Sequence, residues 1–142
     1  MFRRLALAAL LSLIVVTVAG AVVRLTGSGL GCETWPSCES DSLVPRNATN
    51  WHAMIEFVNR LIGMAVGLVA IVAVVAAHRR SPRRGDLINW AWQVLAWVVL
   101  NGLVGAVVVE TELLPAAVIL HFGLAMIAVW SAVVLHYRAG LA

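Results

Sequence analysis

Apolar residues form four long, nearly uninterrupted blocks in this chain, at about residues 5–23, 53–77, 87–109 and 113–135. Each block is close to the ~20 residues with which an α-helix crosses a hydrocarbon core of about 30 Å. The pattern therefore predicts an all-α membrane protein in which residues 1–142 form a single four-helix bundle. Residues 24–52 form the one long loop of this arrangement, and the other two connections are short turns. The first block could pass for a signal peptide, but its apolar run of about 19 residues is too long for one, so we expect an uncleaved helix.

Composition and charge place this bundle in a cell membrane. Hydrophobic residues make up 62% of the chain and charged residues 12%, and all ten basic residues are arginines. Seven of them lie at the N-terminus, between the second and third blocks, or at the C-terminus: Arg3, Arg4, Arg79, Arg80, Arg83, Arg84 and Arg138. The positive-inside rule then predicts that both termini are cytoplasmic and that the loop at 24–52 is external. The net charge of +3 therefore reflects membrane topology, and we expect no nucleic-acid partner.

Four groups that a membrane helix normally excludes lie together in the segment WHAMIEFVNR, residues 51–60. On a helix, His52, Glu56 and Asn59 fall within about 60° of one another. Glu56 lies about 5 Å below the outer end of the second helix, and Asn59 lies about 10 Å below it. An ionisable group at such a depth costs about 2.5–3.5 kcal/mol on insertion scales, so it needs a partner or a cavity.

Two interpretations of this polar face stay open. In the first, Glu56 pairs with Arg60 one turn further along the helix and fixes helix packing. In the second, the face serves a ligand, and it continues through Gly63 and Gly67, whose missing side chains admit a flat macrocycle. The same glycines also suit ordinary close packing between helices.

His121 is the second candidate for chemistry. It lies about 12 Å below the outer end of the fourth helix, at nearly the depth of Asn59. Its helical face continues with small residues at Ala125, Ala128 and Ala132. A slot lined by small residues and headed by an imidazole suits haem, to which histidine supplies an axial nitrogen. A hydrogen bond to a neighbouring helix is the alternative, and Asn101 on the third helix lies deep enough to reach the same site.

Both cysteines of the chain, Cys32 and Cys38, lie in the predicted external loop. Thiols on that side of the membrane are commonly oxidised, which favours a disulfide that closes the segment CETWPSC. A redox-active pair is the alternative. Two cysteines without a neighbouring histidine make a poor zinc site.

The segments GAVVRLTGSGLGCETWPSC, IEFVNRLIG and LPAAVILHFGLA resemble the haem A synthase family, membrane enzymes that convert haem O to haem A for terminal oxidases. The resemblance implies half of a fused pair of four-helix bundles. It also implies that a glutamate of the second helix is associated with catalysis and that histidines of the second and fourth helices serve haem. By this resemblance Glu56 is the catalytic residue, His121 is the ligand of the haem iron, and Cys32 and Cys38 form the disulfide.

The chain departs from the family pattern in two ways. Asn59 stands where the family usually has a histidine, and an asparagine amide does not replace an axial ligand. Haem in this half is then held by His121 alone with Asn59 on the open side, or by a second histidine from elsewhere. His52, about 10 Å closer to the outer surface, suits the haem periphery, and Arg24 and Arg60 are assigned to the propionates on charge alone. The chain also resembles only the first half of the family.

The resulting expectation is oxidation of the C8 methyl group of haem O through an alcohol to the formyl group of haem A, with Glu56 as acid/base. The expected cofactor is haem, as haem O or haem B. The expected partners are a second copy or another half-length chain, a haem O synthase or terminal oxidase, and membrane lipid. One alternative is a non-catalytic haem-handling or oxidase-assembly subunit.

A dihaem electron-transfer cytochrome is a further alternative, with outer (His52, His121) and inner (His78, His136) pairs. The two histidines of the second helix are about 39 Å apart and those of the fourth about 22 Å, so both pairs cannot be level.

Overall fold

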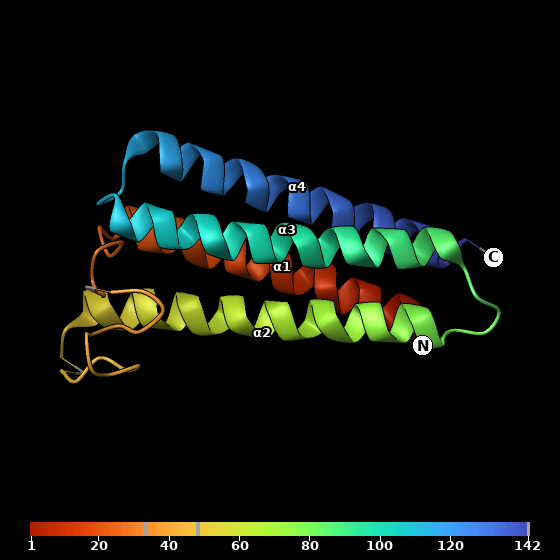
Figure 1. Ribbon diagram of the computed structural model, residues 1–142, viewed down its shortest axis with the longest axis horizontal. Coiled ribbons are helices and arrows are strands. Elements are labelled where there is room, and N and C mark those ends of the chain that lie inside the picture. The colour runs from red at the N-terminus through yellow and green to blue at the C-terminus, as the bar shows by residue number, and fades with distance from the viewer. Residues whose placement is uncertain (33, 48, 142) are drawn as a thin grey trace.

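The computed structural model describes residues 1–32, 34–47 and 49–141 and contains four long α-helices (Figure 1). They are α1 (Phe2–Leu25), α2 (Trp51–Arg79), α3 (Gly85–Glu110) and α4 (Pro115–Gly140). All four are long and apolar enough to cross a membrane, and the described part of the chain has no strand. This confirms the predicted all-α membrane fold. The first three helices extend slightly beyond their apolar blocks, because the helical hydrogen bonding continues into the polar residues at the block ends.

The fourth helix begins later than the sequence predicts, at Pro115 instead of residue 113. Glu112 and Leu113 have positive φ angles of 50° and 65°, a conformation that ends a helix. The Leu113 amide donates to the Val108 carbonyl at 2.8 Å and closes the tight turn between α3 and α4. Pro115 can then occupy the first helical position, where its missing N–H costs little.

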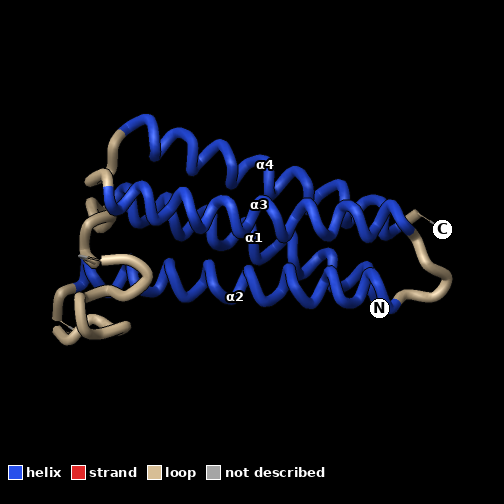
Figure 2. The backbone as a smooth tube through the Cα atoms, in the orientation of Figure 1, coloured by secondary structure: helices blue, strands red, loops and turns tan. Residues whose placement is uncertain are grey.

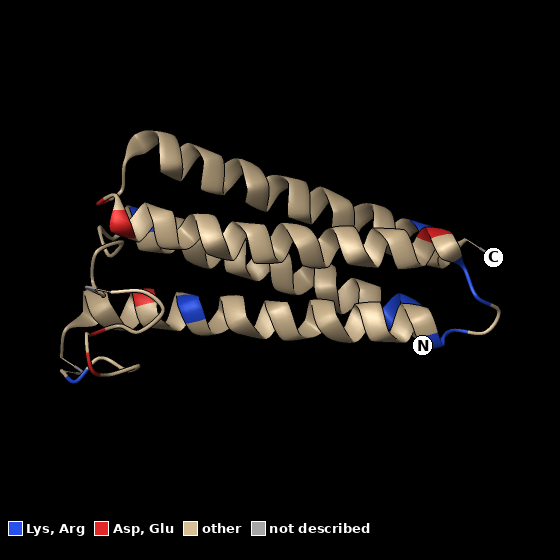
Figure 3. Ribbon diagram, in the orientation of Figure 1, with Lys and Arg blue, Asp and Glu red and all other residues tan. Residues whose placement is uncertain are grey.

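Each helix packs against two neighbours in a four-sided bundle. α1 contacts α2 and α4, and α3 contacts α2 and α4, so that α2 and α4 lie diagonally opposite each other. Both chain termini lie at one end of the bundle, and the long loop lies at the other (Figures 1 and 2). We call the end with residues 26–50 the loop end. The opposite end, with the termini and residues 80–84, carries most of the arginines and is called the arginine end (Figure 3).

The close-packed core occupies only the arginine-end half of the bundle. Its buried residues are Ala6 and Leu13 of α1, Val66, Ala70, Val74 and Ala77 of α2, Leu87, Ala91 and Val94 of α3, and Ala128, Ala132, Leu135 and Ala139 of α4. Alanines predominate because small side chains let helix backbones approach closely inside a membrane. In Figure 1 the ribbons of α2 and α4 converge toward this end and diverge toward the loop end.

Candidate functional site

The loop end begins with a well-capped helix. The Asn50 side chain accepts a hydrogen bond from the Ala53 amide at 3.3 Å, which satisfies one of the free amides of the first turn of α2. His52 lies in that turn, with the Trp51 ring 3.7 Å from its own. The His52 Nδ1 lies 3.0 Å from the hydroxyl oxygen of Ser28, which is fully buried. His52 is therefore engaged by the loop after α1.

A disulfide joins Cys32 to Cys38, as the sequence predicts. Both cysteines are almost fully buried and pack against Ala53 and Phe57 on the first turns of α2. Gly31 explains how the loop comes so close to this helix. A Cβ atom there would lie 2.5 Å from the carbonyl carbon of His52, so a side chain at this position would collide with the α2 backbone.

Glu56 and Arg60 connect this disulfide loop to α2. They form an ion pair, and their side chains are only 6% and 14% exposed. The other Glu56 oxygen accepts the Cys32 amide at 2.9 Å. Arg60 Nη1 donates to the carbonyl oxygens of Thr34 at 2.7 Å and Ser37 at 2.8 Å. The ion pair that the sequence left as one of two interpretations is thus present, and it binds the loop as well.

We call this set of contacts the loop clamp: Glu56, Arg60, the Cys32 amide and the carbonyls of Thr34 and Ser37. A buried ion pair is stable only when its remaining hydrogen-bonding groups are also satisfied, and here the loop backbone satisfies them. The Arg60 guanidinium is thereby occupied, which leaves it poorly placed for a propionate. Arg24 differs, because it is exposed in the last turn of α1 and makes no ion pair with a described residue.

Three other polar residues lie partly buried in the loop-end half. The Oδ1 atoms of Asn59 and Asn101 and the Nδ1 atom of His121 are buried and make no hydrogen bond of good geometry with a described residue. They come from α2, α3 and α4. The His121 imidazole lies against the Asn101 backbone, as the alternative of a contact with a neighbouring helix expects. Gly105 lies one turn from Asn101, and a Cβ atom at Gly105 would be only 3.2 Å from His121 Cε1, so the absence of a side chain there makes room for the imidazole.

All three residues continue the stripes of core residues into this half. Asn59 precedes the core residue Val66 by seven positions, and His121 precedes the core residue Ala128 by seven. Asn101 follows the core residue Val94 by seven. Seven residues are close to two helical turns, so each side chain leaves its helix on the face that points to the bundle axis.

The same half lacks a close-packed interior. Toward the loop end, no described residue of α1 beyond Leu13 or of α3 beyond Val94 is buried. The other two helices bury few residues there, namely Ala53 and Glu56 of α2 and Ala117 and Leu124 of α4. A Cβ atom at Gly63 or Gly67 would meet no atom of another described residue within 4 Å. These two glycines therefore do not pack a helix closely, which was the alternative left open for them. On α4, by contrast, Ala128 and Ala132 belong to the closed core.

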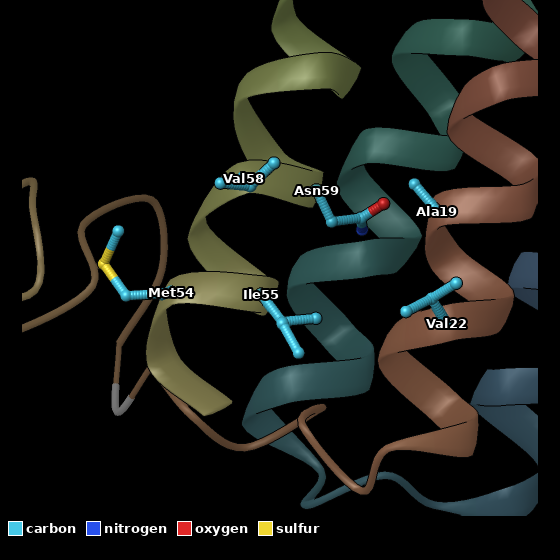
Figure 4. A pocket seen from close by; sticks show the side chains of 6 residues that line it. All are labelled: Ala19, Val22, Met54, Ile55, Val58 and Asn59. Atoms are coloured by element: carbon cyan, nitrogen blue, oxygen red, sulfur yellow. The ribbon is translucent and has the colours of Figure 1, made fainter. Parts of the chain in front are cut away.

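Asn59 also borders a hollow of about 330 Å³ between α1 and α2. The other lining residues are apolar: Ala19, Val22, Met54, Ile55 and Val58. In Figure 4 the Asn59 side chain projects from α2 toward the side of Ala19 and Val22. The hollow connects the polar position to the apolar surface of the bundle.

Sequence reasoning found most of this arrangement and missed part of it. Ser28, the partner of His52, was not predicted, although its place in the glycine-rich segment TGSGLG marks a tight turn. Asn101, named only as a residue deep enough to reach the site, lies on the core face with His121. Of the inner histidines, His78 has its Nδ1 3.0 Å from the Val74 carbonyl in its own helix. His136 Nδ1 is buried and has no partner among the described residues.

Comparison with known proteins adds an independent line of information. Proteins named "Heme A synthase" from Bacillus mycoides (strain KBAB4), Bacillus cereus (strain AH187) and Bacillus anthracis (strain A0248) are each 30% identical over 126 residues. The matched region is 88% of this chain and 40% of each relative, so the chain spans about two fifths of their length. No solved structure matches. The COX15-CtaA family model, described as cytochrome oxidase assembly protein, matches residues 3–55 and 52–141, and the chain therefore belongs to this family.

Proposed function

We propose that this chain binds haem between its helices in the loop-end half, where the His121 imidazole would hold the iron, and that it takes part in haem A formation. Five buried side-chain atoms have no partner among the described residues, and three of them lie on the core face of α2, α3 and α4 in the loop-end half. These three atoms are the observation that carries the proposal. A buried polar atom without a partner costs about 1–3 kcal/mol, so three in one layer favour a ligand that supplies the missing contacts. The names of the relatives support haem as that ligand.

The residues present fit a haem group. His121 offers an imidazole nitrogen, the commonest protein ligand of haem iron. Gly63 and Gly67 leave the neighbouring face of α2 free of side chains. The alanines of the closed core, Ala128 and Ala132, limit how deeply a ring can enter, and the disulfide loop lies across the loop end. We propose haem O or haem B as the bound haem, and the residues named here would contact features that both share.

In the proposed reaction the C8 methyl group of haem O would be oxidised through an alcohol to the formyl group of haem A. The change adds one oxygen atom, from water, and releases four protons and four electrons, which an electron acceptor outside this chain would take up. The protein positions the ring through His121 and limits access of water through the disulfide loop. Glu56, one turn closer to the loop end than Asn59, is the proposed acid/base group. Arg24, exposed at the end of α1, is proposed for a propionate and His52 for the haem edge.

A second candidate is a haem-handling or oxidase-assembly subunit without catalysis. One observation favours it. Both carboxylate oxygens of Glu56 already accept hydrogen bonds, from Arg60 and from the Cys32 amide. The proposed partners in either role are a second copy or another half-length chain, a haem O synthase or the terminal oxidase.

The experiment expresses the full chain in a host that makes haem O and measures the haem-to-protein ratio. His121→Ala should reduce bound haem to near zero, because no other histidine lies at that depth. His136→Ala, on the same helix at the arginine end, is the matched control and should keep the haem. Equal haem contents in wild type and His121→Ala would contradict the proposed site.

Pigment extraction and mass identification then separate the two candidates. Formation of haem A by the wild type supports catalysis, and unchanged haem O supports the handling role. Glu56→Gln is nearly isosteric and keeps an acceptor for the Cys32 amide. If Glu56 is the acid/base group, this variant should retain haem and lose conversion. If Glu56 only holds the loop, haem content, conversion and thermal stability should fall together.

A further inference from the structure

Of the three polar residues Asn59, Asn101 and His121, only His121 has a side chain that commonly binds haem iron. We propose, resting on the haem site above, that the haem has one protein ligand, His121, and that its opposite face is open to a small exogenous ligand. The side-chain amides of Asn59 and Asn101 line that open position. The ligands that fit it are small and neutral, such as water, carbon monoxide or imidazole.

The register of the bundle places Asn59 across from His121. α2 and α4 are diagonal to each other, and both run from the loop end to the arginine end. Asn59 lies 20 residues before Arg79, the last residue of α2, and His121 lies 19 residues before Gly140, the last residue of α4. The two residues are therefore at similar levels on diagonally opposite helices.

No other histidine of the chain lies at the level of Asn59 and His121. The chain has four histidines, and His52 lies seven residues closer to the loop end than Asn59, with its Nδ1 3.0 Å from the Ser28 hydroxyl. His78 and His136 lie near the arginine end of their helices. An amide nitrogen is not basic, so Asn59 does not coordinate iron as an imidazole does.

The amides instead suit a ligand already bound to the open face. Each carries two N–H donors and a carbonyl acceptor, and the carbonyl oxygens of both are buried and unpartnered. The apolar hollow of about 330 Å³ between α1 and α2 reaches Asn59 from the side of the bundle, past Ala19 and Val22 (Figure 4). A small neutral molecule can therefore reach Asn59 without crossing the loop clamp.

The test uses the haem-loaded full-length chain and spectroscopy, independently of any turnover. The ferric wild type should be high-spin by electron paramagnetic resonance, and the ferrous form should bind carbon monoxide with a shifted Soret band. Asn59→His adds an imidazole that can bind the iron on its open face. It should keep the haem-to-protein ratio, convert the ferric spectrum to low-spin, and weaken carbon monoxide binding at least tenfold.

Variants without a new ligand measure the part played by the amides. Asn101→Ala should stay high-spin and lower the affinity for imidazole by about 2- to 10-fold, the effect of one lost hydrogen bond. Gln93→Ala removes an exposed amide from the same helix and should change neither spectrum nor affinity. An unchanged affinity in Asn101→Ala would remove Asn101 from the pocket.

The possible failures are distinguishable. Absence of haem from the purified wild type would contradict the haem site itself. Haem that depends on His121 but is low-spin in the wild type and does not bind carbon monoxide would overturn the open face alone, with the second ligand supplied by another copy. Should Asn59→His fail to fold, the wild-type spin state and its carbon monoxide binding still decide the question.

Discussion

The two halves of this bundle use the same helix faces for different purposes. In the arginine-end half the core stripes carry alanine, valine and leucine, which are buried and in mutual contact. In the loop-end half the same stripes carry Asn59, Asn101 and His121, whose polar atoms find no partner. The arginine-end half also has two buried polar atoms without a partner among the described residues, Ser131 Oγ and His136 Nδ1. The halves therefore differ in how closely their apolar residues pack, and a loosely packed polar stripe is typical of a site that binds a ligand.

The loop-end half is therefore held by contacts at its end and not by its interior. The loop clamp joins the disulfide loop to α2 through Glu56 and Arg60. Gly29 brings the same loop against Leu113 in the turn between α3 and α4, since a Cβ atom there would lie 3.0 Å from that side chain. The loop thus touches both sides of the bundle opening and can fix the spacing of helices that pack loosely below it.

The largest effect is expected from breaking the loop clamp. Arg60→Ala leaves the Glu56 carboxylate buried without its counter-ion, and breaking a buried pair typically costs about 3–5 kcal/mol. We expect a lower thermal unfolding midpoint in detergent and loss of haem. Arg24→Ala, which removes an exposed arginine from the same end, is the stability control and should leave the midpoint of the haem-free protein nearly unchanged. Equal midpoints for the two variants would show that the clamp does not stabilise this half.

A core variant tests the other half. Leu135 is fully buried in α4, and its replacement by alanine leaves a cavity that costs about 2–5 kcal/mol in well-packed interiors. Leu135→Ala should lower the unfolding midpoint and keep the haem-to-protein ratio of the protein that remains folded. Thermal melts paired with haem quantification measure both. A loss of haem from folded Leu135→Ala protein would mean that the two halves are not separable.

An apolar replacement in the loop-end half is expected to raise the stability of the haem-free protein, whereas the two variants above lower it. Asn101→Leu removes an unpartnered buried amide, whose cost is about 1–3 kcal/mol. The haem-free protein should therefore become more stable, while the haem-loaded protein gains less. The readout is the unfolding midpoint of both forms. A destabilised haem-free Asn101→Leu protein would show that this amide is satisfied in the membrane without a ligand.

The smallest effect is expected at the hydrogen bond between Ser28 and His52. Ser28→Ala removes one contact, worth about 0.5–1.5 kcal/mol. The midpoint should fall slightly and the haem content should stay near that of the wild type. Thr26→Ala, which removes a neighbouring hydroxyl 2.7 Å from the Ser28 oxygen, measures how much of the effect passes through Ser28. A large loss of haem in Ser28→Ala would instead place His52 among the haem-binding residues.

The sequence alone was enough to predict the membrane helices and several local features. Apolar blocks of the right length identify the spans, because only a helix satisfies every backbone hydrogen bond in lipid. The spacing of Glu56 and Arg60 predicts their ion pair, since residues four apart on a helix are neighbours. The two cysteines predicted their disulfide, because they are only six residues apart in a loop that we expect on the oxidising side of the membrane.

Only the tertiary structure decided which helix faces meet. Lipid and helix interior are both apolar, so hydropathy does not distinguish a residue that faces lipid from one that faces the bundle axis. That Asn59, Asn101 and His121 share the core face depends on packing contacts of Val66, Val94 and Ala128. The further partners of Arg60 also lie beyond sequence reasoning. They are backbone carbonyls 26 and 23 residues earlier in the chain, and only the folded loop brings them to the guanidinium.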